Sequence, residues 1–384
     1  MKIAVITTTR ADYGLLYWPL KKLEQDPYFD LKIIASGTHL SPHHGLTYHQ
    51  IEEDGFQIDW KVEMLLSSDT AVGASKALAL ATIGFSECFD HLRPDLVLLL
   101  GDRYEMLAAA QSAMLANIPV AHIAGGDVTE GAFDESIRHS ITKMAHIHFP
   151  TNNLAGERIK QMGENPDNIH VVGSPGLDYI AEATLMRRAE LEKSLGIKFG
   201  DTNLLVTYHP ETLEKDTKDH FAELVKALGR LDKSIGIIFT RPNSDPGAGE
   251  MNRQIDDFRQ KREGMSVFAS LGSTRYLSVV SIVDAVVGNS SSGLYEAPSL
   301  QTPTVNIGDR QKGRIQAASV INSRPEAEQI LKSIEEALAL NCSDVVNPYG
   351  DGNASERIVD ALKRLRDPQQ LIRKQFFKLG SESS

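Results

Sequence analysis

Short apolar runs alternate with helix-like segments along the chain. The runs are rich in Val, Ile and Leu and are continuous, which is typical of parallel strands buried on both faces of a sheet. The predicted strands are residues 2–7, 31–36, 95–100, 119–123 and 169–172 in a first series, and 204–208, 236–240, 266–269, 284–288 and 303–307 in a second. Two such series predict an α/β protein with two doubly wound sheets. Open parallel sheets bind ligands at the carboxyl ends of their strands.

Apolar residues between the strands follow helical spacing. In residues 12–25, Leu16, Leu20 and Leu23 fall near one face of a helix, which predicts an amphipathic helix directly after the first strand. The last segment, about residues 365–384, is charged and helical in pattern. We expect it to return to the first domain.

A Ser-Pro-Gly turn at residues 174–176, followed by a polar helix at 185–195, indicates a domain boundary. We therefore predict an N-terminal domain at 1–178 and a C-terminal domain at 179–364. A chain of 384 residues with 41% hydrophobic residues can fill two full cores.

The net charge of −11 comes from 40 basic and 51 acidic side chains. A surface that bound nucleic acid would be expected to carry the opposite sign, so we expect no nucleic-acid partner. A cleft can be locally positive on an acidic protein, which keeps a small anionic ligand possible.

The N-terminal apolar run, residues 3–6, is too short for a signal peptide or a membrane span. Two cysteines, Cys88 and Cys342, exclude a disulfide framework and a multi-cysteine metal site. We expect a cytoplasmic protein without a membrane partner.

The first predicted strand ends in Thr7-Thr8-Thr9-Arg10 and lacks a Gly-x-Gly-x-x-Gly turn. The absence of that fingerprint argues against a dinucleotide-dependent oxidoreductase. Arg10 would lie above the strand end, where a guanidinium can pair with a diphosphate. The structural alternative is a surface arginine at the start of a helix.

The strand at 95–100 leads directly into Gly101-Asp102-Arg103-Tyr104-Glu105. A carboxylate and a guanidinium at the end of a buried strand make Asp102 and Arg103 candidate site residues. The alternative is that Asp102 is an N-cap, paired with Glu105 three residues later.

The strand at 119–123 leads into a double glycine, which would let a ligand approach the backbone closely. The following loop is crowded with the carboxylates Asp127, Glu130, Asp134 and Glu135. Two carboxylates in one site can have their pKa values driven apart, which yields a base and an acid. The structural alternative for Asp134 is again an N-cap.

In the second half, the strand at 204–208 ends at His209, which Pro210 biases toward an extended conformation. An imidazole there could donate to a phosphate oxygen or protonate a leaving group, or it could be a turn histidine without a function. His146 and His148 share one face of an extended segment, but no third ligand accompanies them, so we expect no metal.

The strongest local signal is the strand at 284–288 followed by Asn289, Ser290, Ser291 and a predicted helix. Amides and hydroxyls at such a turn, at the positive end of a helix dipole, suit a diphosphate. Glu296 lies one turn later, where a carboxylate can accept both ribose hydroxyls. Ordinary serine capping is the alternative.

Taken together and in order, these motifs make the chain similar to the hydrolysing UDP-N-acetylglucosamine 2-epimerases of sialic- or legionaminic-acid-type sugar synthesis. The resemblance covers nearly the whole chain, and its motifs are specific only in combination. It is carried by Thr9-Arg10-Ala11-Asp12, Gly101-Asp102-Arg103, Gly125-Gly126, residues 137–143, His209-Pro210-Glu211-Thr212, Gly288-Asn289-Ser290-Ser291 and Asp309-Arg310-Gln311.

The resemblance implies a GT-B type fold: two Rossmann-like domains with the active site in the interdomain cleft. It also implies a UDP-sugar substrate, no metal, no cofactor, and a homodimer or homotetramer. By the same resemblance, Asp102, Asp134 and His209 match catalytic positions. The implied substrate-binding residues are Arg10 on the phosphate side, Ser290, Ser291 and Arg314 at the diphosphate, Glu296 at the ribose and Asn243 near the nucleoside. Arg103, from its place at a strand end, is a further candidate substrate-binding residue.

One position departs from part of the family. Some relatives carry a glutamate directly before the double glycine, where this chain has Ala124, and others have a carboxylate after it, where this chain has Asp127. Asp127 is therefore a fourth candidate catalytic residue, and a water is the alternative.

C2 of an N-acetylhexosamine has no adjacent carbonyl, so simple deprotonation there is too costly. Loss of the anomeric diphosphate makes elimination to a 2-acetamidoglycal feasible, and water then adds to that glycal. The expected substrate is UDP-N-acetylglucosamine, giving N-acetylmannosamine and UDP, or alternatively UDP-N,N'-diacetylbacillosamine. Three rival functions stay open: a non-hydrolysing epimerase, a GT-B glycosyltransferase and a nucleotide-sugar sensor that only binds its ligand.

Overall fold

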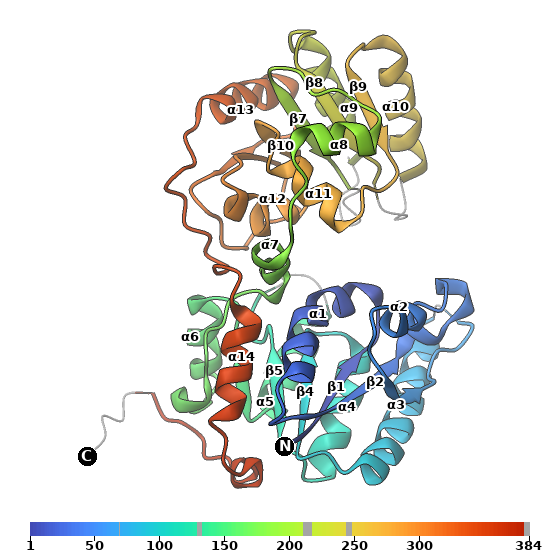
Figure 1. The fold of residues 1–384 in the computed structure, drawn as a ribbon, viewed down its shortest axis with the longest axis vertical. Helices are drawn as coiled ribbons and strands as arrows, with labels where there is room; N and C mark the ends of the chain where they lie inside the picture. The colour runs from blue at the N-terminus through green and yellow to red at the C-terminus, as the bar shows by residue number, and fades with distance from the viewer. Residues whose placement is uncertain (69, 129–132, 210–216, 243–247, 380–384) are drawn as a thin grey trace. The chain divides into compact units, whose positions relative to one another are not determined.

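The computed structural model describes residues 1–68, 70–128, 133–209, 217–242 and 248–379. The chain forms two compact units (Figure 1). Unit 1 comprises Met1–Ala181 and Tyr349–Ser384, and unit 2 comprises Glu182–Pro348. Among the described residues, no helix combines the length and apolar character needed to cross a membrane.

Unit 1 contains a six-stranded parallel sheet of order β3-β2-β1-β4-β5-β6. Its strands are β1 (Lys2–Thr7), β2 (Asp30–Ser36), β3 (Ile58–Val62), β4 (Leu96–Leu100), β5 (Val120–Ile123) and β6 (Ile147–Phe149). Its helices are α1 (Arg10–Gln25), α2 (Tyr48–Glu53), α3 (Ala71–Leu92), α4 (Tyr104–Leu115), α5 (Asp134–Met144), α6 (Asn153–Gln161), α7 (Asp178–Glu182) and α14 (Ala354–Lys363).

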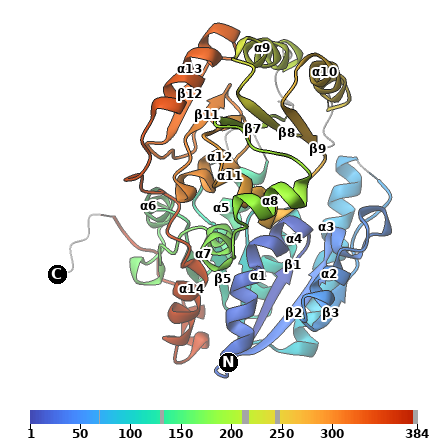
Figure 2. The same ribbon diagram turned by 45° about the horizontal axis from the view of Figure 1, so that its top comes forward.

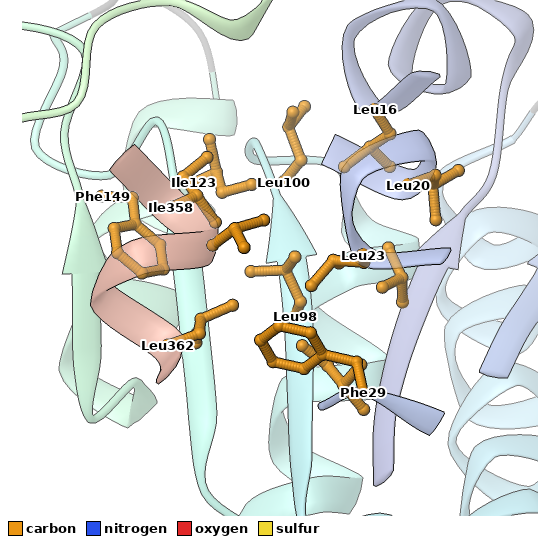
Figure 3. Packing of buried hydrophobic residues seen from close by; sticks show 14 of the residues in the cluster. Leu16, Leu20, Leu23, Phe29, Leu98, Leu100, Ile123, Phe149, Ile358 and Leu362 are labelled. Atoms are coloured by element: carbon orange, nitrogen blue, oxygen red, sulfur yellow. The ribbon is translucent and has the colours of Figure 1, made fainter. Parts of the chain in front are cut away.

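Helices cover both faces of this sheet, as continuous apolar strands require. On one face, α1 and α14 pack side by side against β1, β4 and β5. Figure 3 shows Leu16 and Leu20 of α1, and Ile358 and Leu362 of α14, directed toward the sheet. On the other face, α3, α4 and α5 bury a second apolar cluster.

Unit 2 contains the second six-stranded parallel sheet, of order β12-β11-β10-β7-β8-β9. Its strands are β7 (Asn203–Thr207), β8 (Gly236–Thr240), β9 (Met265–Phe268), β10 (Ala285–Gly288), β11 (Thr304–Ile307) and β12 (Val320–Ser323). Its helices are α8 (Arg188–Leu195), α9 (Thr217–Arg230), α10 (Ala248–Lys261), α11 (Ser273–Val280), α12 (Ser292–Tyr295) and α13 (Ala327–Ala339). Figure 2 shows α9, α10 and α13 on one side of this sheet and α8 and α11 on the other.

The predicted fold class, two doubly wound parallel sheets, is confirmed, and nine of the ten predicted strands are present within a residue or two. The strand predicted at 169–172 is wrong. His170 donates its backbone N–H to His148 O, but the segment forms only one parallel bridge, between His148 and Ile169.

Three of the strands were not predicted from the pattern. Two of them, β3 and β12, lie at sheet edges. Most residues in each are partly exposed, so their sequences, IDWKV and VINS, lack the continuous apolar run of a central strand. The third, β6, has only three residues and is also an edge.

The chain returns to unit 1 at Tyr349, earlier than the expected residue 365. The reason is α14, whose apolar face completes the core beside α1. The α-helix predicted at 365–384 is wrong for its described part. It contains only a short 3₁₀ turn, Pro368–Ile372, which Asp367 caps.

A buried carboxylate fixes the start of α14. Asp178 is 1% exposed and accepts hydrogen bonds from the backbone N–H groups of Ala354 (2.8 Å) and Ser355 (2.6 Å). Burial raises the pKa of Asp178, and these bonds oppose that rise. Asp178 is therefore an N-cap supplied from another part of unit 1.

We expect Asp178→Ala to lower the free energy of unfolding by about 2 kcal/mol, because two buried helix amides would lose their acceptor. Urea denaturation followed by circular dichroism measures this. Asp367→Ala is the matched control, since Asp367 caps the exposed 3₁₀ turn through Gln369 N. Equal losses in the two variants would contradict the assignment.

Candidate active site

In unit 1, a buried arginine organises the loops that follow β4 and β5. Arg138, one turn into α5, has a side chain only 5% exposed. Its guanidinium forms an ion pair with Asp102, and it donates to Glu135 Oε2 (2.9 Å) and to the backbone O of Asp127 (2.9 Å). The sequence contains no sign that Arg138 is buried, because an arginine in a helical pattern is expected to lie on the exposed face.

The capping alternatives for Asp102 and Asp134 do not hold. Arg103 occupies the N-cap position of α4, and Phe133 that of α5, and neither side chain makes a capping bond. Asp102 instead pairs with Arg138, and Asp134 is the first residue of α5. The pKa of Asp134 is raised by burial and by the charge of nearby Asp102, while Arg138 and Arg103 oppose that rise.

The third candidate carboxylate, Asp127, already has protein partners. Thr151 Oγ1 donates to its Oδ2 (3.2 Å) and Asn152 Nδ2 to its Oδ1 (3.0 Å). Burial raises the pKa of Asp127, and both bonds counteract that effect. These contacts tie the loop after β5 to the start of α6. The neighbouring Ala124 has φ +61°, a conformation that is uncommon for alanine.

Buried His122 connects the Asp102 turn to α5. Its Nε2 lies 2.7 Å from Gly101 O, so this nitrogen carries the proton. Its Nδ1 lies 3.3 Å from Thr142 Oγ1, and this hydroxyl donates its proton to the carbonyl of Arg138. Burial lowers the pKa of His122 to about 3, so the ring is neutral at physiological pH. A histidine inside a strand gave no sequence signal for this contact.

The two candidate substrate-binding arginines of unit 1 differ in their contacts. Arg10 is exposed at the first position of α1. Arg103 donates to Glu105 Oε1 (2.8 Å), a carboxylate that is completely buried. Glu105 Oε2 has no hydrogen-bond partner among the described residues. Among the residues that the structure describes, no cluster of His, Cys, Asp or Glu could hold a metal ion.

In unit 2, Asn289 joins three strand-end loops. It is fully buried, and its side chain forms a two-point contact with the backbone of His209, accepting from N–H (2.7 Å) and donating to C=O (2.8 Å). Its own carbonyl accepts from Gln311 Nε2 (2.9 Å) and Arg310 Nη1 (3.1 Å). Asn289 therefore fixes the ends of β7, β10 and β11 relative to one another.

Glycine is required immediately before this turn. A Cβ at Gly288 would lie 1.9 Å from Thr207 O, and its φ is +143°. A helix follows the turn, as predicted, but α12 is only a single turn, followed by a 3₁₀ turn at Ala297–Leu300 that contains Pro298. Its dipole is correspondingly small, so an anion near Ser290 and Ser291 would depend on hydroxyls, amides and nearby arginines.

Several polar atoms near this turn are buried and lack a hydrogen-bond partner among the described residues: Tyr276 Oη, Ser292 Oγ and Glu296 Oε2. Burial raises the pKa of Glu296. Burial also raises the pKa of Tyr276 to about 12, and the Glu296 charge adds to this. Ser292 counteracts both of these rises in pKa, so the three side chains form one buried polar group beside the turn.

Of the remaining candidates, Arg314 donates to Gln311 Oε1 (2.9 Å), and its guanidinium carbon lies 5.7 Å from the centre of the Tyr295 ring. Arg314 is thus connected to Asn289 through Gln311. Asn243 lies outside the described residues. Each unit therefore holds its own group of candidate residues at the carboxyl ends of its strands.

A doubly wound unit with a small-residue turn backed by arginines is typical of proteins that bind phosphorylated ligands. Paired carboxylates in unequal environments are typical of enzymes that transfer protons. The chain belongs to the UDP-N-acetylglucosamine 2-epimerase family, whose model matches residues 21–363.

Two relatives extend this result. The chain is 40% identical to GDP/UDP-N,N'-diacetylbacillosamine 2-epimerase (hydrolyzing) of Campylobacter jejuni, over 87% of each chain. It is 36% identical to UDP-N,N'-diacetylbacillosamine 2-epimerase (hydrolyzing) of Legionella pneumophila, over 97% of this chain and 98% of the relative.

Among solved structures, the chain resembles the UDP-GlcNAc 2-epimerase of Neisseria meningitidis bound to UDP-GlcNAc. The TM-score is 0.77 at 18% identity, over 95% of this chain and 100% of the other. This likeness confirms the expected GT-B-like pair of Rossmann-like domains.

We expect Arg138→Met to lower the free energy of unfolding by about 2 kcal/mol, because Asp102, Glu135 and the Asp127 carbonyl would lose a shared, buried donor. Urea denaturation measures the loss. Arg253→Met is the control: Arg253 also pairs with a carboxylate three residues away, Glu250, but its side chain is 74% exposed. A loss below about 0.5 kcal/mol in both variants would show that Arg138 does not organise these loops.

Proposed function

We propose that this protein is a hydrolysing 2-epimerase. It would expel UDP from a UDP-linked 2-acetamido sugar, invert C2 and release the free sugar. The observation that carries the proposal is the Asp102–Arg138–Asp134 group, which combines an ion-paired carboxylate with a second carboxylate of raised pKa. The names of both relatives, which specify a hydrolysing 2-epimerase, support the reaction type.

In the proposed reaction, the C1–O bond to the diphosphate breaks as C2 loses its proton, giving UDP and a 2-acetamidoglycal. Water then adds at C1, and C2 is protonated from the opposite face. Efficient proton transfer needs a group whose pKa lies near the working pH. Burial and the Asp102 charge raise the pKa of Asp134 above its ordinary value, while Arg138 and Arg103 oppose that rise, and we assign Asp134 as one proton-transfer group. Asp102 would be the second proton-transfer group.

The nucleotide is assigned to unit 2. Ser290, Ser291 and Arg314 would bind the diphosphate, and His209 would assist its departure by donating a proton or a hydrogen bond. Donors placed where charge develops lower a barrier most effectively when they are fixed in advance. The double contact between Asn289 and the His209 backbone supplies such fixation.

Glu296 would accept the ribose hydroxyls, which would satisfy its buried Oε2. Asn243 would contact the nucleoside, and Arg10 and Arg103 the phosphates. Asp127 is the weakest of the catalytic candidates, since Thr151 and Asn152 already occupy both of its carboxylate oxygens. The proposal retains a homodimer or homotetramer as the assembly, which the family resemblance implies.

For the sugar, we propose the 2,4-diacetamido-2,4,6-trideoxy hexose of UDP-N,N'-diacetylbacillosamine, because both relatives reported above are named for it. UDP-N-acetylglucosamine is the second candidate, favoured by the family model.

Incubation with each sugar nucleotide in deuterium oxide, followed by proton NMR, tests the proposal. We expect UDP and a free reducing sugar that is inverted at C2 and carries deuterium there, with faster turnover of the diacetamido substrate. The GDP-linked form should be included, because the name of one relative covers both nucleotides. A UDP-linked product would indicate a non-hydrolysing epimerase. UDP release with C2 unchanged would indicate a glycosyl-transfer or simple hydrolytic reaction, and binding without turnover would indicate a sensor.

We expect Asp102→Asn to reduce kcat at least about 100-fold if Asp102 transfers a proton. Its residual activity should have a pH profile displaced toward lower pH, because removal of the Asp102 charge lowers the pKa of Asp134. Arg138→Met should displace the profile the other way, since Arg138 holds that pKa down. The measurement is kcat/KM against pH for both variants. Shifts in the same direction would exclude Asp134 as the titrating group.

A further inference from the structure

Unit 1 contains a buried carboxylate with two lysine partners that the proposed reaction does not use. Glu164 is 2% exposed and accepts hydrogen bonds from His148 Nε2 (3.0 Å) and Lys143 Nζ (2.5 Å), and it pairs with Lys374 Nζ (2.6 Å). Burial alone would raise the pKa of Glu164, but these three partners lower it to about 2. The carboxylate is therefore charged at neutral pH and needs all its donors.

Lys374, in the C-terminal segment 373–378, also binds the end of α5. Its Nζ donates to the backbone carbonyls of Lys143 (2.8 Å) and Ala145 (2.6 Å). The last carbonyls of a helix have no partner inside it, and a cation there is favoured by the helix dipole. Lys374 thus acts as a cationic cap on α5, supplied by residues more than 200 positions further along the chain.

The same segment is attached at a second point. Phe377 N–H donates to Gly163 O (2.8 Å). The ring of Phe376 lies directly over Gly163, where an added Cβ would come within 2.4 Å of it. Lys143 Nζ lies 5.1 Å from the centre of that ring, within the range of a cation–π contact. The segment is therefore held against α5 and the loop after α6 by several independent contacts.

The opposite end of α5 carries Asp134, which is assigned to proton transfer, and Arg138, which pairs with Asp102. Asp134 is its first residue, and Arg138 follows one turn later. An α-helix of eleven residues moves largely as one body, so a shift at Lys143 and Ala145 is transmitted to Asp134 and Arg138. Displacements of about 1 Å at reacting groups can reduce rates roughly 100-fold.

We propose that Lys374 is a positioning residue for the reaction: by capping α5 and anchoring it to Glu164, it fixes the helix that carries Asp134 and Arg138. This inference rests on the proposed function, in particular on the role of Asp134. It assigns a mechanical role to a C-terminal segment that lies far from those residues in sequence.

The test compares Lys374→Met with Lys374→Arg and with the matched control Arg373→Met. Arg373 is the adjacent cation of the same segment, and its side chain has no hydrogen bond or ion pair to any residue that the structure describes. With the UDP-sugar that the enzyme turns over, we expect Lys374→Met to lower kcat about tenfold and to change KM less than about twofold. Lys374→Arg should restore most of kcat, and Arg373→Met should match the unmodified protein.

Hydrogen exchange measured by mass spectrometry supplies a second readout. Backbone amides of residues 137–144 should exchange faster in Lys374→Met and unchanged in Arg373→Met. If Lys374→Met does not fold, Phe376→Ala loosens the same segment by removing a ring that is 71% exposed, and we expect a smaller loss of kcat, about threefold.

A lower melting temperature with unchanged kcat in Lys374→Met, and in Phe376→Ala, would overturn the inference and leave only a structural role. Asp134→Asn separates this failure from that of the proposed function. If Asp134→Asn is inactive and Lys374→Met is fully active, only the role of Lys374 is contradicted. A fully active Asp134→Asn removes the role assigned to Asp134, and the role of Lys374 with it, whereas an unmodified protein that turns over none of the sugar nucleotides contradicts the proposed function itself.

Discussion

The buried guanidinium of Arg138 is the interaction on which the candidate chemistry of unit 1 depends. Three loop or helix segments converge on it, through Asp102, Asp127 and Glu135. A planar group with five donors can hold such partners in fixed directions, which a lysine could not do. Burying a charge is costly unless it is fully paired, and here the pairing also sets where the carboxylates lie. The same charge limits how far the pKa of Asp134 can rise.

In unit 2, the strand-end loops are held in place by a neutral side chain. Asn289 offers one donor and one acceptor to the backbone of a single residue, His209, in the manner of a strand pairing. Because the side chain is buried and neutral, it carries no desolvation cost of a charge. The two units thus fix their strand-end loops by different physical means, ionic in one and dipolar in the other.

Much of this could be predicted from the sequence. Central strands such as β4 (LVLLL) are continuous and apolar, and they predicted the fold class. Edge strands such as β3 contain polar residues, as loops do, and could not be recognised as strands. The strand-end positions of Asp102 and His209 followed from the sheet alone, whereas Asp134 begins α5, beyond the loop after β5, and was singled out by the family resemblance. The roles of Arg138 and His122 were not predicted, because burial at those positions is created by segments distant in sequence. The sequence predicted a helix after the small-residue turn but not its length, and α12 is a single turn.

The placement of α14 has a consequence for how the chain is made. Unit 2 is one continuous stretch, Glu182–Pro348, whereas the core of unit 1 is incomplete until Ile358 and Leu362 have been synthesised. Each of these side chains contributes about 1.5–3 kcal/mol through burial. During translation, the N-terminal part of unit 1 therefore exposes apolar residues beside α1 until α14 has been synthesised, while unit 2 can already fold. A chaperone that binds the nascent chain would contact these exposed apolar residues rather than a completely folded unit 1.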